Sequence, residues 1–324
     1  MVKPARPTQR ASKPQAGRRS PPSRTLAWLA AAALVLLGAQ AVQLQLRKAE
    51  QRLYAAPTAK LPHGDADGQV LGTLAVAGDA GGRFYHLDES AGQWRLQRFG
   101  PGLIWQATRR GPLKAGQHVA GMAVGPDGTV LLAIDDGVLL QLNARLERPQ
   151  AKAGFGPLTG FCGDGQGGSW SLRGQAPTLQ HLDAQGKELA LSGALSRMNE
   201  PTAAMAAGAD GELAVLIPKG KQLQQVRIYG ADGALKSRFE VPLPPAPEHK
   251  LALAGGFVLL NENRQGRGLT VYSSVGRYVG QLTNLGPRDL IALQGFVGAD
   301  VAKAEGCVGH NLGLSCFSTR GWRP

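Results

Sequence analysis

The sequence is poor in charged residues. Asp, Glu, Lys and Arg together make up 18% of the 324 residues, whereas glycine occurs 45 times. Few charges combined with many glycines are typical of a β protein rich in turns rather than of a helical protein. The length allows one large domain or two smaller ones with a substantial core.

Sequence motifs of common catalytic sites are missing as well. The chain has no Gly-x-Ser-x-Gly nucleophile elbow, no Walker-type phosphate loop and no Cys-x-x-Cys pair. The glycine-rich stretch 154–168 lacks the lysine of a phosphate loop. The histidines lie in separate parts of the chain without metal-ligand spacing: His63, His86, His118, His181, His249 and His310. We therefore assign no catalytic residue and predict no cofactor.

The positive charge is concentrated at the N-terminus. The formal net charge is +13, and residues 1–24 hold seven Lys and Arg residues with no acidic residue. From Gln69 onward there are 25 basic and 20 acidic side chains, a nearly balanced set. A basic tail beside an apolar segment usually sets membrane orientation. We expect residues 1–24 to be a disordered cytoplasmic tail and expect no nucleic-acid binding.

An apolar segment follows this tail directly. Leu26–Leu46 contains no Asp, Glu, Lys or Arg, and 21 residues in a helix would span roughly 30 Å, the thickness of a hydrocarbon core. We predict a single transmembrane anchor at residues 25–46, with the N-terminus in the cytoplasm. Residues 47–68 are then a stalk, and the rest of the chain lies in the periplasm, attached to the inner membrane.

Other interpretations of this segment stay open. Ala39 and Ala41 have the small-x-small spacing of a signal-peptidase site, so cleavage near Ala41 would give a secreted protein. Apolar residues continue beyond Ala41, which favours an anchor. The pair Arg18-Arg19 resembles a twin-arginine export signal but lacks the apolar residues expected after it. A buried helix of a soluble protein is disfavoured by the asymmetry of the flanking charge.

A unit of two apolar runs joined by a glycine-containing turn recurs along the chain. In Ala123–Asn143 the runs are separated by Pro-Asp-Gly and Asp-Asp-Gly, which are strong hairpin signals. Similar stretches are Leu74–Asp88, Gly160–Gly174, Ala204–Pro218, Leu251–Asn263 and Ile291–Lys303. Their last turn glycines are Gly82, Gly128, Gly168, Gly211, Gly256 and Gly295, at intervals of 46, 40, 43, 45 and 39 residues.

These repeats predict an all-β fold, a six-bladed β-propeller at residues 69–324 preceded by the transmembrane helix. Several units continue with a second pair of runs, which gives four short antiparallel strands per unit. One such sheet cannot bury both faces alone, and packing the units around an axis buries them. The alternative is a β-sandwich, which the regular spacing disfavours.

Two of the units resemble NHL-type repeats. Asn199–Leu216 and Ala120–Asp135 have an apolar strand, an Asp-Gly turn and a second strand, and in the first a proline-containing loop leads into the unit. The resemblance covers roughly residues 69–324. It implies a six-bladed propeller and no particular activity.

The last two cysteines flank a predicted hairpin turn. If Asn311-Leu312 is a two-residue turn, His310 pairs with Gly313 and Cys307 lies opposite Cys316. Non-hydrogen-bonded neighbours of antiparallel strands lie about 4.5 Å apart at Cα, within disulfide range. We predict a Cys307–Cys316 disulfide, which the periplasm permits. Unpaired thiols and a metal site are the alternatives, whereas Cys162 is expected to be a buried apolar residue.

Oxygen ligands for a divalent ion are the remaining chemical possibility. In six-bladed lactonases and related hydrolases, Glu, Asn and Asp residues of different blades hold such an ion at the axial channel. A comparable set here contains Glu200, Asn261, Asn263 and Asp289, and hard oxygen ligands suit calcium. The sequence motifs of lactonases are absent, so a metal-dependent hydrolase is the alternative function.

The favoured function is non-catalytic binding or scaffolding in the cell envelope. Propellers present a rigid face whose loops vary freely, a common basis for recognition. The expected partner is another envelope protein or an anionic polymer. The sequence identifies neither the partner nor the oligomeric state.

Overall fold

The computed structural model describes residues 52–53, 57–152, 154–174, 178–191, 193–198, 200–208, 211–243, 250–261, 269–282, 306–310 and 313–317. The chain from Gln51 to Pro324 forms one compact unit. Its described residues form β-strands and two short 3₁₀ helices, η1 (Pro101–Leu103) and η2 (Leu195–Arg197). Within these ranges no helix has the length and apolar character to cross a membrane. The predicted tail (1–24) and anchor (25–46) lie outside the described residues.

The first two sheets are built from antiparallel meanders, and within each meander consecutive strands pair. One contains β3 (Ala75–Gly78), β4 (Phe84–Ser90), β5 (Gln93–Gly100) and β6 (Ile104–Pro112). The other has eight strands: β7 (Val119–Val124), β8 (Val130–Ile134), β9 (Leu139–Leu142), β10 (Gln150–Lys152), β11 (Leu158–Gly163), β12 (Ser169–Arg173), β13 (Thr178–Leu182) and β14 (Glu188–Leu189). It consists of two four-stranded meanders joined by parallel pairing of β7 and β11, with Gly121 opposite Phe161.

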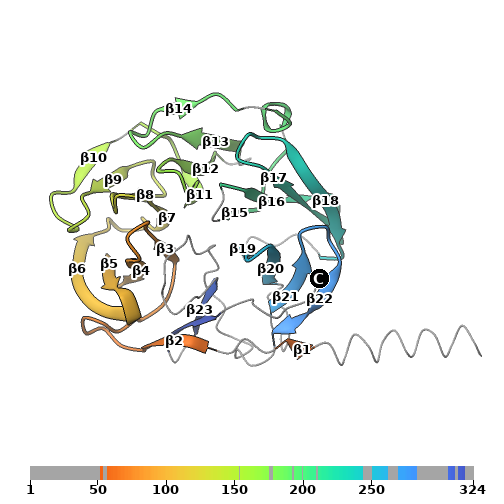
Figure 1. Cartoon of the computed structure of the whole chain (residues 1–324). Coiled ribbons are helices and arrows are strands. Elements are labelled where there is room, and N and C mark those ends of the chain that lie inside the picture. Colours follow the sequence, from red (N-terminus) through yellow and green to blue (C-terminus); the bar gives the residue numbers. More distant parts are fainter. Residues whose placement is uncertain are drawn as a thin grey trace, which may run out of the picture. The chain divides into compact units, whose positions relative to one another are not determined.

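Two further meanders follow along the chain. One contains β15 (Ala204–Ala207), β16 (Leu213–Pro218), β17 (Gln224–Tyr229) and β18 (Leu235–Val241). The other contains β19 (Lys250–Ala254), β20 (Phe257–Asn261), β21 (Leu269–Ser273) and β22 (Tyr278–Leu282), with β1 (Arg52–Leu53) added in parallel outside β22. In Figure 1 the meanders succeed one another around a common centre, and β3, β7, β11, β15 and β19 lie innermost. This is the arrangement of a β-propeller.

The last sheet joins the two ends of the compact unit. It contains β2 (Pro57–Pro62), β24 (Gly313–Phe317) and β23 (Gly306–His310), in this order. β23 and β24 form the predicted hairpin, in which His310 lies opposite Gly313 and Cys307 opposite Cys316. β2 runs antiparallel to β24, with Ala59 opposite Cys316. The sheet therefore pairs strands that lie about 250 residues apart in the sequence.

The expectation of a stalk at residues 47–68 is corrected for part of this range. Pro57–Pro62 is strand β2 of the closing sheet, so the propeller begins before residue 69. The loop after β2 is fixed to the first meander as well, because Arg95 of β5 donates to the carbonyl oxygens of Gly64 and Asp65. The backbone groups of an extended segment are satisfied here by a neighbouring strand rather than by water.

The predicted hairpins of five units are present. β3–β4, β7–β8, β11–β12, β15–β16 and β19–β20 overlap the five stretches from Leu74 to Asn263. The sixth stretch, Ile291–Lys303, lies outside the described residues. The apolar core is divided among the spaces between adjacent sheets: Tyr85 and Leu96 of the first sheet pack with Met122 and Leu132 of the second. Burying each such large side chain contributes about 1.5–3 kcal/mol, so the repeated sheets stabilise one another.

Candidate binding groove and the predicted site residues

The structure places Glu200 in an ion-pair cluster. Glu200 lies in the loop before β15, and its carboxylate accepts hydrogen bonds from Arg227 (Nη2 to Oε1 2.7 Å, Nη1 to Oε2 2.8 Å) and from Lys219 (Nζ to Oε1 2.8 Å). The two hydrogen bonds from Arg227, and then the one from Lys219, lower the pKa of Glu200 to about 2. Both carboxylate oxygens are engaged by cations, an environment that repels a divalent ion.

Of the other three proposed oxygen ligands, the structure describes one. Asn261 is the last residue of β20 and is buried, whereas Asn263 and Asp289 lie outside the described residues. In the part of the chain that the structure describes, no group of three or more His, Cys, Asp or Glu residues is arranged to hold a metal ion. The metal-dependent site stays a prediction.

The cysteines occupy two different environments. Cys316 is buried, and the strand register sets Cys307 opposite it, which is the arrangement that a cross-strand disulfide requires. The bond itself remains a prediction. Cys162 of β11 is buried, and burial raises the pKa of its thiol to about 12. Its thiol is therefore protonated at neutral pH and is no nucleophile.

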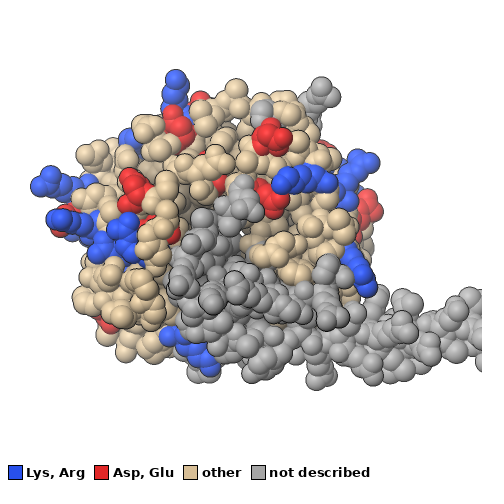
Figure 2. All heavy atoms as spheres, viewed as in Figure 1, with Lys and Arg blue, Asp and Glu red and all other residues tan. Residues whose placement is uncertain are grey.

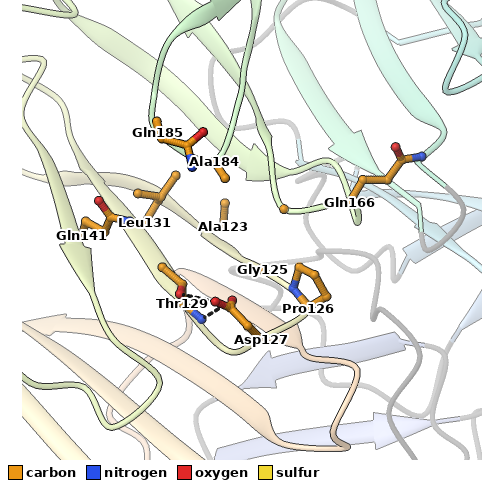
Figure 3. Close-up of a pocket in the computed structure, with 11 residues that line it drawn as sticks. Ala123, Gly125, Pro126, Asp127, Thr129, Leu131, Gln141, Gln166, Ala184 and Gln185 are labelled. Carbon is orange, nitrogen blue, oxygen red and sulfur yellow. Dashed lines mark hydrogen bonds between the residues drawn. The ribbon is translucent and has the colours of Figure 1, made fainter.

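A groove lies between the two meanders of the eight-stranded sheet. Its volume is about 400 Å³, and it is bordered by the β7–β8, β11–β12 and β13–β14 turns (Figure 3). The residues that line it are Ala123, Gly125, Pro126, Asp127, Thr129, Leu131, Gln141, Gln166, Gly167, Ala184 and Gln185. The volume falls in the range of small ligand sites, about 300–1,000 Å³. A groove of this size accepts a few side chains of an extended segment.

The β7–β8 turn fixes one wall. Asp127 accepts hydrogen bonds from the backbone N–H of Thr129 at 2.9 Å and from its hydroxyl at 2.8 Å. These two bonds lower the pKa of Asp127, so its carboxylate is charged at neutral pH and is held within its own turn. The arrangement is a side-chain turn cap, which favours Asp at this position.

The β11–β12 turn fixes the opposite wall. Asp164 accepts hydrogen bonds from the backbone N–H groups of Gln166 and Gly168 at 2.8 and 2.9 Å and contacts His181 Nε2 at 2.8 Å. Burial raises the pKa of Asp164, but the hydrogen bonds with His181 and the turn outweigh it, so the net shift is downward. His181 stacks on Trp170, with ring centroids 4.0 Å apart. The wall is therefore anchored on buried side chains.

The groove combines an apolar floor with a polar rim. Ala123 and Leu131 are buried, whereas the side chains of Gln141 and Gln185 are less enclosed and carry amides that both donate and accept hydrogen bonds. Figure 3 shows the Gln166 side chain directed away from the other labelled residues, so its turn backbone lines the groove. The lining residues include no Ser, Cys, His or Lys, and the Thr129 hydroxyl and the Asp127 carboxylate are hydrogen-bonded to each other. The lining therefore offers amide and backbone hydrogen-bonding groups beside an apolar surface.

Sequence reasoning missed this groove. Gln141 belongs to the β7–β10 unit, Gln166 and Gln185 belong to the β11–β14 unit, and the three share no motif. Their proximity follows from the parallel pairing of β7 with β11, a contact between units that the period of the repeat does not show. The sequence signals nearest to the groove are the turns Asp127-Gly128 and Asp164-Gly165, which predict strand connections and no binding site.

Comparisons with known proteins identify the fold. No protein-family model matches the chain, and no curated protein matches it. A chain of the solved structure titled "Crystal Structure of Mitotic Checkpoint Complex" is similar to it with a TM-score of 0.53 at 10% identity, covering 83% of this chain and 94% of that chain. A second, titled "Crystal structure of BBS1N in complex with ARL6DN, soaked with mercury", has a TM-score of 0.45 at 12% identity, covering 78% of this chain and 79% of that chain. These neighbours are WD40-like propellers, so the likeness to the first of them shows that the chain has a β-propeller fold.

Proposed function

We propose that the chain is a membrane-anchored, six-bladed propeller that binds a protein partner outside the cytoplasm and catalyses no reaction. Five of the blades are the meanders β3–β6, β7–β10, β11–β14, β15–β18 and β19–β22, and the sixth contains β2, β23 and β24. The NHL-type resemblance belongs to the same proposal. The basic tail and the apolar segment support the anchor and its orientation.

The observation that carries the binding function is the groove between β7–β10 and β11–β14. Its walls are fixed by Asp127 and Asp164, its lining offers hydrogen-bonding groups, and its one side-chain hydroxyl, that of Thr129, is bonded to Asp127. The titles of both solved neighbours describe complexes, which suits a fold used for protein recognition. Figure 2 shows one face of the propeller, on the described part of which acidic and basic side chains are interspersed. A mixed surface favours a protein partner over an anionic polymer.

Crosslinking in intact cells tests this function. A photoreactive amino acid replaces Gln185 at the groove, and a second variant carries it at Ala80, an exposed residue of the β3–β4 turn that does not line the groove. We expect a defined protein adduct from position 185 that disappears when Ala184→Trp fills the groove. Absence of that adduct, or equal adducts from both positions, would contradict the proposal.

Membrane attachment has its own test. Cell fractionation followed by protease treatment of intact spheroplasts should leave the chain in the membrane fraction and digest the propeller from outside. Recovery of the whole chain in the soluble fraction, with residues 25–46 intact, excludes the anchor. A soluble chain that begins near Ala41 supports the cleaved-signal alternative.

A further inference from the structure

Strand β6 is an unusually long open edge. β6 is the outermost strand of its sheet and has nine residues, whereas the outermost strands β10 and β14 have three and two. The outer edge of β22 is covered by β1. Among the described strands, none pairs with the outer edge of β6. An uncovered edge presents N–H and C=O groups that can pair with another strand.

The side chains of β6 differ from those of the other long edge strand. β18 carries Lys236, Arg238 and Glu240 along its length, a pattern that discourages strand addition. The first half of β6 is uncharged and contains Ile104, which is 69% exposed, and Trp105, which is 42% exposed. These two are adjacent large apolar residues at the surface, and the Trp105 indole is held by a hydrogen bond to Thr108 Oγ1 at 2.9 Å.

The strand register arranges β6 as an apolar end and a basic end. A bulge lies at Gln106, because Trp105 pairs with Phe99 and Ala107 with Arg98. Side chains alternate faces from there, which places Thr108 and Arg110 on the face of Trp105, and Ala107 and Arg109 on the face of Ile104. Each face of the edge therefore presents an apolar residue near the start of β6 and an arginine near its end.

The charges select the kind of segment that can pair with this edge. β6 contains two arginines and no acidic residue. Arg109 is exposed and has no ion pair among the described residues. Arg110 is exposed too, but its Nη2 donates to the Asp65 carbonyl oxygen at 2.9 Å, and its guanidinium lies 3.6 and 3.7 Å from the carboxylates of Asp65 and Asp67. A second copy of β6 paired in parallel would bring arginines together, and the basic N-terminal tail carries the same sign. Both occupants are disfavoured by like-charge repulsion.

The same propeller already shows an added outer strand. β1 lies in parallel along β22, with Arg52 opposite Gln281 and Leu53 opposite Leu282. The outer edge of a blade in this fold is thus geometrically open to a fifth strand. In strand addition the backbone hydrogen bonds supply affinity and alternate side chains supply specificity.

We propose that the outer edge of β6 binds an extended segment of a partner protein as an additional strand, with apolar residues beside Ile104 and Trp105 and acidic residues beside Arg109 and Arg110. This inference rests on the proposed protein-binding function and names the chemistry of the bound segment. The edge is a separate surface from the groove, since no β6 residue lines that groove.

A peptide titration tests the edge directly. The probes are two fluorescent nine-residue peptides of alternating valine and threonine that end in two glutamates or in two lysines. Binding to the full chain in detergent is followed by fluorescence anisotropy. We expect the glutamate peptide to bind at least tenfold more tightly than the lysine peptide, and Arg109→Glu to abolish or reverse this preference. The matched control Arg238→Glu, an exposed arginine on β18, should leave it unchanged.

The outcomes separate this inference from the proposed function. Equal binding of the two peptides, no binding of either, or an equal effect of Arg109→Glu and Arg238→Glu overturns the β6 proposal. A cysteine at Gln106 that crosslinks two copies of the chain would show self-pairing instead and would also overturn it. If position 185 gives no adduct but the peptide still binds as expected, the proposal for the groove is contradicted and the proposal for the β6 edge stands.

Discussion

Arg95 and Asp88 face each other across β5 and β4 and form a buried, two-bonded ion pair. Arg95 Nε lies 2.8 Å from Asp88 Oδ1 and Nη2 lies 2.5 Å from Oδ2, with the two side chains 3% and 0% exposed. The same guanidinium donates from Nη1 to the Asp65 carbonyl oxygen at 2.7 Å. One side chain thus connects two strands of the first blade to the segment that leads from β2.

Removal of this guanidinium should destabilise the propeller. Arg95→Met leaves the Asp88 carboxylate buried without its cation, which costs about 3–5 kcal/mol. The measurement is the midpoint and slope of urea unfolding for the full chain in detergent. The double variant Arg95→Met/Asp88→Leu removes the stranded charge and should recover part of the loss. Equal stability of wild type and Arg95→Met would show that the ion pair does not stabilise the fold.

His86 predicts a dependence of stability on acid pH. His86 is fully buried, its Nε2 lies 3.0 Å from Thr73 Oγ1, and burial lowers its pKa to about 4 despite the nearby Asp88 carboxylate, while Arg95 adds to the lowering. The unfolded chain, with a histidine pKa near 6.5, takes up a proton at higher pH than the folded chain does. Stability is therefore complete above pH about 6.5 and falls by about 3 kcal/mol as the pH decreases to about 4.

Unfolding free energies between pH 7 and pH 4 check this dependence. The variant His86→Gln has no imidazole to protonate. Its free energy of unfolding should therefore depend less steeply on pH, although it is less stable at pH 7. His118→Gln is the control, because His118 is a surface residue whose side chain is 71% exposed. Identical slopes for wild type and His86→Gln would exclude the assignment to His86.

Gly128 tests the contact between the first two blades. Its φ is +87°, and an added Cβ would lie 2.7 Å from Tyr85 Oη and 2.8 Å from Arg83 Nη2. Gly128→Ala therefore combines a left-handed backbone with a steric clash, and we expect a loss of about 2–4 kcal/mol. Gly92→Ala is the matched control, since Gly92 has a φ of +71° with nothing near its Cβ position. It should lose only about 1–2 kcal/mol. Thermal unfolding compares the two, and equal losses would show that the blade contact is loose.

The closing hairpin predicts a redox-dependent stability. A disulfide between Cys307 and Cys316 closes a short loop and contributes about 2–3 kcal/mol in the chain-entropy model. Without reductant, thiol labelling of the denatured chain should then modify Cys162 alone of the three cysteines, and reduction should expose all of them. Labelling of all three before reduction would show that Cys307 and Cys316 are unbonded neighbours.

The sequence supports the blades better than the contacts between them. Five hairpins followed from local signals, because apolar strands joined by turns such as Gly125–Gly128 are encoded within about fifteen residues. Pro57–Pro62, which is β2, was expected to belong to a stalk because it lies between the predicted anchor and the first repeat. Its pairing with β24 depends on a partner at the other end of the chain. Propensity alone does not identify a strand whose stability comes from such a distant partner.

The candidate site shows the same limit. Glu200 was grouped with channel ligands by comparison with six-bladed lactonases, whereas it pairs with Arg227 of β17, 27 residues away. The groove depends on the register between β7 and β11. The first contact joins a loop to a strand of the same unit and the second joins two units, and the period of the repeat shows neither of them.

The affinity of the crosslinked partner for the full chain tests the binding account most directly. It is measured in detergent for the wild type, for Ala184→Trp in the groove and for Ala80→Trp on the β3–β4 turn. The account predicts that Ala184→Trp weakens binding at least tenfold, whereas Ala80→Trp matches the wild type. Unchanged affinity of Ala184→Trp, with the fold intact by circular dichroism, would contradict a propeller that recognises its partner through the groove.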